Sequence, residues 1–158
     1  MDYIKANEDY IPFLIDCRKM QLAEEGQDPG VNIDQELTDY FFRKMKDGSL
    51  VEYIALERGD MDLIAGTAAI LFADFPPSFA NPKGVRGYIT NMYTSPAFRH
   101  QGVASVLLQC LVNEAKQQGV TKLFLSASEM GKPVYKRFGF EEQNTWMVLD
   151  LDETGKGN

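Results

Sequence analysis

The stretch SPAFRHQGVASVLLQCLVNEA, residues 95–115, decides the fold because it joins a short polar turn to a strongly patterned helix. The helix carries small or apolar side chains at a spacing that places them on one face, and this stripe consists of Ala104, Leu107, Leu108, Leu111 and Ala115. Gly119 closes the helix. Its beginning is unusual, because Gly102 stands where Ser, Thr, Asp or Asn would normally cap a helix.

The turn before this helix has the composition of a pyrophosphate site. A helix N-terminus has unpaired N–H groups and a partial positive charge, and Gly102 lets a ligand approach them closely. Arg99 adds a positive charge with a bidentate fork, and Ala104 is small enough for tight packing on a strand. A plain strand–loop–helix with a tolerated glycine explains the same residues. The signatures of P-loop and dinucleotide sites are both missing from the sequence.

Outward from this helix, the periodicity predicts one α+β domain covering residues 1–158. Extended and helical patterns alternate along the chain without a repeat or a linker. Strands are expected at 2–6, 50–56, 61–75, 86–94 and 122–127, with a final strand or hairpin half at 140–151. Helices are expected at 7–26, from 32 or 34 to 47, at 102–119 and at 133–138. Gly66 inside the third strand indicates a bulge.

Composition narrows the class of protein. Sixteen Lys and Arg stand against 23 Asp and Glu, which gives a net charge of −7 and disfavours a nucleic-acid partner. Cys17 and Cys110 fit neither a disulfide framework nor a metal site, so we expect no metal. The acidic N-terminus is unlike a signal peptide, and the longest near-apolar run, 63–73, is too short to span a bilayer. We therefore expect a cytoplasmic protein without a membrane partner.

Two segments resemble a known family. The run from Arg99 to Ala104 resembles the (Arg/Gln)-x-x-Gly-x-(Gly/Ala) loop of the GNAT superfamily, the acetyl-coenzyme A-dependent N-acyltransferases. The segment GKPVYKRFGF, residues 131–140, is similar to the family's second signature, a tyrosine shortly before a Gly-hydrophobic pair. The resemblance covers residues 86–140, whereas the first 50 residues match only in the layout of their elements.

The resemblance implies a three-layer α+β fold with a mixed, mostly antiparallel, V-splayed sheet. In such a fold the strands at 86–94 and 122–127 run parallel and splay apart, and the pantetheine arm of acetyl-CoA pairs with the free edge of the first. The residues that this likeness assigns to the coenzyme are Met92, Tyr93, Thr94, Arg99, His100, Gln101, Gly102, Val103, Ala104 and Ser128. Ser128 stands where the family often has Asn, and its shorter hydroxyl replaces the amide there.

The implied reaction is the attack of a neutral amine on a thioester in a ternary complex. Tyr135 matches the family's proton donor to the leaving thiolate, although a tyrosine packed in the core explains it too. The strand before the phosphate loop carries no carboxylate, so the base cannot be assigned from sequence. Glu129 and Glu52 are candidates, although a solvated or structural role explains each of them better. His100 is better explained as a phosphate neighbour than as a catalyst.

The acceptor is expected to be an amine of a small molecule or peptide. Two groups of residues bear on it: apolar side chains that could line its pocket or pack in the core (Phe72, Phe75, Phe79 and Met92), and acids that would attract a cationic amine or merely solvate the surface (Glu24, Glu25, Asp28, Asp34, Glu36, Asp39 and Asp74). A coenzyme sensor without turnover and an interaction domain without ligand remain alternatives, and a homodimer is compatible with the sequence.

Overall fold

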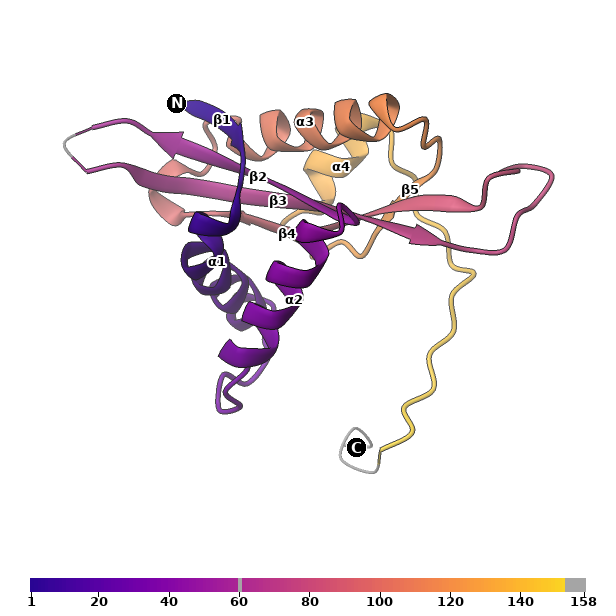
Figure 1. Ribbon diagram of the computed structural model, residues 1–158, viewed down its shortest axis with the longest axis horizontal. Coiled ribbons are helices and arrows are strands. Elements are labelled where there is room, and N and C mark those ends of the chain that lie inside the picture. Colours follow the sequence, from indigo (N-terminus) through magenta and orange to yellow (C-terminus); the bar gives the residue numbers. More distant parts are fainter. Residues whose placement is uncertain (60, 153–158) are drawn as a thin grey trace.

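The computed structural model describes residues 1–59 and 61–152 and contains one five-stranded sheet in the order β1-β2-β3-β4-β5. Neighbouring strands are antiparallel from β1 to β4, and β5 runs parallel to β4 (Figure 1). The strands are β1 (Asp2–Lys5), β2 (Leu50–Glu57), β3 (Leu63–Asp74), β4 (Val85–Thr94) and β5 (Leu123–Leu125). The helices are α1 (Ile11–Glu24), α2 (Asp34–Lys46), α3 (Val103–Gln117) and α4 (Lys132–Phe138), with short 3₁₀ turns η1 (Glu8–Tyr10) and η2 (Pro96–Phe98).

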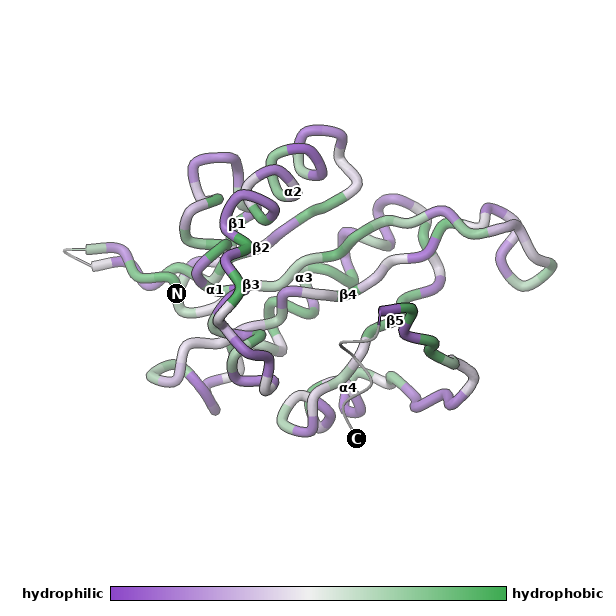
Figure 2. Tube along the Cα trace, turned by 90° about the horizontal axis from the view of Figure 1, so that it is seen from below, coloured by the Kyte–Doolittle hydropathy of each residue, from purple (hydrophilic) through white to green (hydrophobic). Residues whose placement is uncertain are grey.

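Helices cover both faces of the sheet, so the fold has three layers. α3 and α4 lie on one face, and α1 and α2 lie on the other (Figure 1). The α3 face is packed by the predicted stripe, of which Leu107, Leu108 and Leu111 are fully buried. The opposite cluster centres on Leu14 and Phe41. Figure 2 shows green segments along the strands and alternating green and purple along the helices, as expected for helices with one buried face.

β4 carries a bulge in its second half. Tyr93 pairs with Thr67 and Thr90 with Ala69, so β4 has one residue more than β3 over this interval. Asn91 is in the bulge and has a φ of 53°. This is a left-handed conformation, which Asn tolerates better than most residues. The bulge turns the Asn91 side chain onto the sheet face covered by α1 and α2, where its amide contacts β2.

Most of the predicted architecture is confirmed. The α+β class, the mixed and mostly antiparallel sheet, and the parallel pairing of the strands predicted at 86–94 and 122–127 are all present. The bulge expected at Gly66 occurs beside it, where Ala55 pairs with Gly66 but Leu56 pairs with Ile64. Among the described residues, no helix is both long and apolar enough to cross a bilayer.

The predicted last strand, 140–151, is wrong. Residues 140–151 form no ladder with the five strands, and the side chains of Met147, Val148 and Leu149 are largely exposed. Trp146 alone makes a ring contact with the sheet, stacking on Phe124 at 6.3 Å between centroids. A strand needs a hydrogen-bonded neighbour, and β5, at the edge of the sheet, is itself paired over only three residues. Alternation of apolar residues alone therefore did not suffice to predict a strand at 140–151.

Candidate active site

The turn before α3 forms a cradle of backbone N–H groups. Gly102 occupies the N-cap position with φ +83° and no side-chain cap, and a Cβ built there would meet nothing within 4 Å. In the part of the chain that the structure describes, the N–H groups from Gln101 to Ala104 donate to no acceptor. A helix start with free donors and open space in front of it can bind an anion. The assignment of these groups to a pyrophosphate stays a prediction.

The Arg99 side chain is fixed by two partners that the sequence did not predict. Its Nε donates to the Thr94 carbonyl at 2.9 Å, which ties the turn to the end of β4. Its Nη2 lies 2.6 Å from a carboxylate oxygen of Glu24 on α1. The guanidinium is therefore already paired, and its charge toward a phosphate is partly compensated. The neighbouring His100 has a left-handed backbone, with φ 61°, and is exposed.

The end of β4 has a free edge where the sheet opens. β5 pairs with β4 only from Gly87 to Ile89, so no described strand pairs with Asn91 to Thr94 on that side. On the other side, β3 holds this segment as far as Thr94. Met92, Tyr93 and Thr94 thus lie where an extended, amide-bearing ligand could add to the sheet. β4 therefore continues for five residues beyond the point at which its pairing with β5 ends.

Tyr135 on α4 belongs to the core cluster on the α3 side of the sheet. Its ring is 8% exposed and packs edge-on against Phe140. Its hydroxyl forms no hydrogen bond with the described residues. Burial, followed by the charges of Glu25 and Tyr88, raises the pKa of Tyr135 to about 12, so the phenol stays protonated and able to donate.

Ser128 shapes the turn that leads into α4. Its Oγ accepts a hydrogen bond from the Gly131 N–H at 3.1 Å. A Cβ on Gly131 would lie 3.0 Å from the Tyr135 ring, so any larger residue there would press against the tyrosine. Ser128 therefore positions the helix that carries Tyr135 and is exposed beside it. A contact from Ser128 to the coenzyme stays a prediction.

A buried carboxylate lies behind the β4 bulge. Glu52 on β2 is 1% exposed, and its Oε2 accepts a hydrogen bond from the Asn91 Nδ2 at 3.1 Å. Its Oε1 has no hydrogen-bond partner among the described residues. Burial raises the pKa of Glu52 to about 8, although the Asn91 hydrogen bond and the charge of Arg18 oppose the shift. The other candidate base, Glu129, is largely exposed and pairs with Lys132 at 2.8 Å.

The bulge also forms the floor of a pocket of about 290 Å³ on the α1 and α2 side of the sheet. Its lining combines aromatic and apolar walls with a few polar groups: Arg18, Leu37, Tyr40, Phe41, Leu71, Tyr88, Thr90 and Asn91. Neither set of residues proposed for the acceptor from sequence lines it. Phe72 and Met92 pack against the core on the α3 side, Phe79 is fully exposed, and the seven acids lie elsewhere.

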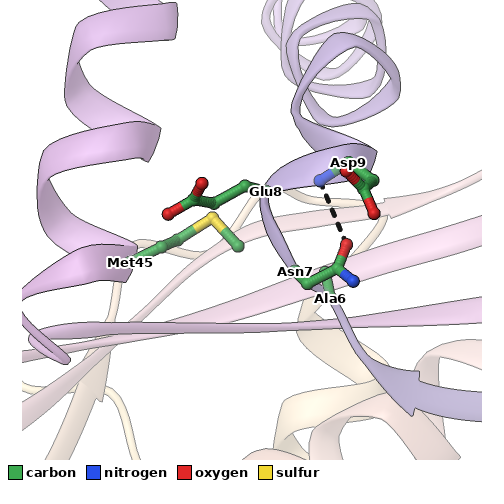
Figure 3. Close-up of a pocket in the computed structure, with 5 residues that line it drawn as sticks. All are labelled: Ala6, Asn7, Glu8, Asp9 and Met45. Carbon is green, nitrogen blue, oxygen red and sulfur yellow. Dashed lines mark hydrogen bonds between the residues drawn. The ribbon is translucent and has the colours of Figure 1, made fainter.

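A second hollow, of about 420 Å³, lies where η1 begins (Figure 3). Asn7 caps this turn by accepting a hydrogen bond from the Asp9 N–H at 3.0 Å, and Met45 of α2 closes the other side. Its polar residues are exposed and it shares no lining residue with the pocket beside the β4 bulge, so we place no chemistry there. Within residues 1–59 and 61–152, no group of three His, Cys, Asp or Glu could hold a metal ion.

The mixed five-stranded sheet, with β5 parallel to β4 and helices on both faces, agrees with the fold that the sequence motifs implied. The family model of the acetyltransferase (GNAT) family matches residues 15–140, and the chain belongs to that family. It is therefore an acyltransferase.

Solved structures agree with this assignment. A predicted acetyltransferase from Clostridium acetobutylicum, crystallised with acetyl-CoA, is 47% identical to this chain over 95% of it and 96% of that protein, with a TM-score of 0.89. A GCN5-related N-acetyltransferase from Ralstonia eutropha JMP134 is 24% identical over 95% and 97%, with a TM-score of 0.86. The glucosamine-6-phosphate N-acetyltransferase of Arabidopsis thaliana shares the fold at 19% identity over 96% and 98%, with a TM-score of 0.70.

Sequence reasoning missed Asn91 and ranked Glu52 no higher than a structural residue. One sequence signal pointed to Glu52. It falls between Leu50 and Ile54 on the inward face of its strand, where burying a carboxylate costs desolvation free energy. The hydrogen bond that joins Glu52 to Asn91 could not be found in the same way, because it depends on the register of β2, β3 and β4 and on the bulge.

Proposed function

We propose that this protein transfers the acetyl group of acetyl-CoA to a primary amine of a small molecule by direct attack in a ternary complex. The observation that carries the proposal is the buried Glu52, whose Oε1 has no partner among the described residues and whose Oε2 is bonded to Asn91, a residue that lines the pocket. The phenol of Tyr135, in the core cluster on the α3 side of the sheet, is the second group that supports it. A domain that only senses coenzyme A needs neither group. An enzyme needs both, one to take a proton from the amine and one to give a proton to sulfur.

The donor site is formed by two backbone features. The free N–H groups from Gln101 to Ala104 bind the pyrophosphate, and the free edge of β4 at Met92 to Thr94 binds the amides of the pantetheine arm. The Clostridium relative, crystallised with acetyl-CoA, supports this donor. Acetyl-CoA supplies an activated thioester whose carbonyl carbon accepts the amine.

Two side chains of the protein, Glu52 and Tyr135, transfer the protons of the reaction. An alkylamine of pKa about 10 is mostly protonated at neutral pH, so attack requires a base. Glu52 takes the proton at Oε1, directly or through one water, and Asn91 holds its other oxygen in place. The C–N bond forms as the C–S bond breaks, and the O–H of Tyr135 donates to the departing sulfur. A raised carboxyl pKa, closer to that of an amine, makes Glu52 a better base than an exposed carboxylate.

The direct test is the release of free thiol from acetyl-CoA in the presence of a panel of primary amines. We expect thiol release that depends on the amine, with N-acetylated product of equal amount. Binding of coenzyme A by calorimetry without thiol release from any amine would favour the sensor. Absence of binding would favour an interaction domain.

Gly102→Glu should abolish most of the donor binding. The substitution places a carboxylate in front of the free N–H groups, where it competes with the phosphates and repels them. We expect the Kd for acetyl-CoA, measured by calorimetry, to rise at least about tenfold.

Backbone strain must be separated from charge, because Gly102 has a positive φ. Gly102→Ala adds strain alone, and Gly48→Glu adds both strain and charge at a glycine with φ +80° at the end of α2. Both controls should bind acetyl-CoA more tightly than Gly102→Glu does. Equal affinity of Gly102→Glu and the wild type, in a folded protein, would remove the phosphates from the α3 start.

A further inference from the structure

The pocket beside the β4 bulge has a single charged residue in its wall. Arg18 of α1 lies there among Tyr40, Leu71, Tyr88 and other uncharged side chains. Its guanidinium donates to Oε1 of Gln21 at 3.1 Å, a neutral partner that orients the group without cancelling its charge. No described carboxylate lies within 4 Å of this guanidinium.

Two other arginines of this protein differ from Arg18 because they form ion pairs with carboxylates. Arg99 is paired with Glu24, and Arg58 with both Asp2 and Asp62. Arg18 has no ion-pair partner among the described residues, since its side-chain hydrogen bond goes to the neutral Gln21. A half-buried guanidinium with donors left over favours an anionic ligand.

The size and walls of the pocket limit the rest of the ligand. Its volume of about 290 Å³ falls at the lower end of the range for small-molecule sites. Tyr40, Tyr88 and Leu71 provide surfaces for an aromatic or apolar body rather than for a polar sugar. Thr90 and Asn91 lie at the bulge, which is the end nearest the acetyl group in the proposed function.

We infer that the acceptor is a compact amine bearing a carboxylate on an aromatic or apolar body, with the carboxylate bound by Arg18 and the amine directed toward Asn91. This inference rests on the proposed function, since it names the substrate class of the same site. It replaces the cationic acceptor expected from sequence, because the acids on which that expectation depended do not line this pocket.

Three probes of similar size separate the charge requirement from shape. They are 4-(aminomethyl)benzoate, 4-(aminomethyl)benzamide and p-xylylenediamine, which present a carboxylate, a neutral amide and a second ammonium at the same end of one aromatic amine. We expect kcat/KM for the carboxylate to exceed that for the amide by about 10- to 100-fold, and the dication to be the poorest of the three. Equal values for carboxylate and amide, or a preference for the dication, would overturn the inference.

Variants at Arg18 assign the preference to this residue. Arg18→Gln should lower the carboxylate-to-amide ratio of kcat/KM to within about threefold of unity, whereas Arg18→Lys should keep part of it. Lys19→Gln is the matched control, because it removes an equal charge from the next, exposed position of α1 and should leave the ratio unchanged. The ratio cancels any change that Arg18→Gln makes to the pKa of Glu52, since both probes use the same base. An unchanged ratio in Arg18→Gln would remove the role of Arg18.

The failure of this inference is distinguishable from failure of the proposed function. If no amine in the panel releases thiol, acetyl transfer itself is refuted. If the benzamide is acetylated as well as the benzoate, acetyl transfer stands and only the carboxylate preference falls. Calorimetric titration of the wild type and Arg18→Gln with 4-(aminomethyl)benzoate gives a readout independent of turnover, and equal Kd values there would also refute the inference.

Discussion

Glu52→Gln is expected to slow turnover by about 10²- to 10⁴-fold while making the folded protein more stable. Gln keeps the shape of the side chain and can still accept the hydrogen bond from Asn91. It cannot accept a proton from the amine, so the chemical step loses its base. Steady-state thiol release measures the first effect, and thermal or denaturant unfolding measures the second.

The gain in stability follows from the direction of the pKa shift. The pKa of Glu52 is about 8 in the folded protein and near 4.5 in the unfolded chain, so the folded state binds more protons between these values. Ionisation therefore costs the folded protein nothing below about pH 4.5, an increasing amount as pH rises toward 8, and a constant amount above it. Glu52→Gln removes this cost, and we expect a gain of at most about 4 kcal/mol near pH 7.5 that shrinks as the pH is lowered.

The pH profile identifies Glu52 as the base. With an amine whose own pKa lies well below 8, kcat/KM of the wild type should rise with pH through about 8, and this step should be lost in Glu52→Gln. The titratable and charged groups near Glu52 are Cys17 and Arg18 of α1 and Tyr40 of α2. Burial raises the pKa of Cys17 to about 11 and that of Tyr40 above its ordinary value, so neither accounts for a step near 8.

Glu114→Gln provides a matched control on the opposite face of the sheet. Glu114 is also buried, but it is paired with Lys5 at 2.9 Å and accepts hydrogen bonds from Tyr53 and Gln118. Burial opposes its ionisation, yet these partners hold its pKa below the usual value, so its charge stabilises the fold above the unfolded pKa. We expect Glu114→Gln to destabilise the protein at neutral pH and to leave turnover near normal. A Glu52→Gln enzyme with wild-type turnover would refute the assigned base.

Glu52 and Glu114 illustrate which features the sequence could predict: those set by local patterns, but not those set by partners from distant segments. The helix from Val103 to Gln117 was predicted to within a residue or two, because its apolar stripe and its two flanking glycines are local signals. The phosphate cradle and Tyr135 follow from short motifs next to it. Nothing local distinguishes Glu52 from Glu114, since each lies in an amphipathic segment and their partners come from other strands and helices.

Long-range pairing explains the remaining errors as well. Arg99 was expected to face a ligand freely, but Glu24, 75 positions away in sequence, lies against it in the fold. The segment at 140–151 alternates like a strand, yet alternation does not provide a neighbouring strand. The sequence also does not tell which face of the sheet Phe72 and Tyr88 occupy: Phe72 packs against the core on the α3 side, whereas Tyr88 lines the pocket on the other face.

Tyr135→Phe is expected to lower turnover by about 10²- to 10⁴-fold while the Kd for acetyl-CoA stays within about threefold of the wild type. Phe retains the ring that packs against Phe140 and loses only the hydroxyl, which has no hydrogen-bond partner among the described residues. The departing thiolate then leaves without a proton donor. Stopped-flow or steady-state thiol release measures turnover, and calorimetry measures binding.

The pH dependence of Tyr135→Phe separates an acid from a base. Because burial raises the pKa of Tyr135 to about 12, the phenol is protonated throughout the working range and its loss should lower kcat/KM by the same factor at every pH from about 6 to 9. The step near pH 8 should therefore persist in Tyr135→Phe, although it disappears in Glu52→Gln. Tyr53→Phe is the control, since it removes a phenol that bonds to Glu114 on the α3 face and should affect stability without affecting turnover. If Tyr135→Phe turns over at the wild-type rate, the tyrosine packs in the core and the leaving thiolate is protonated by another group.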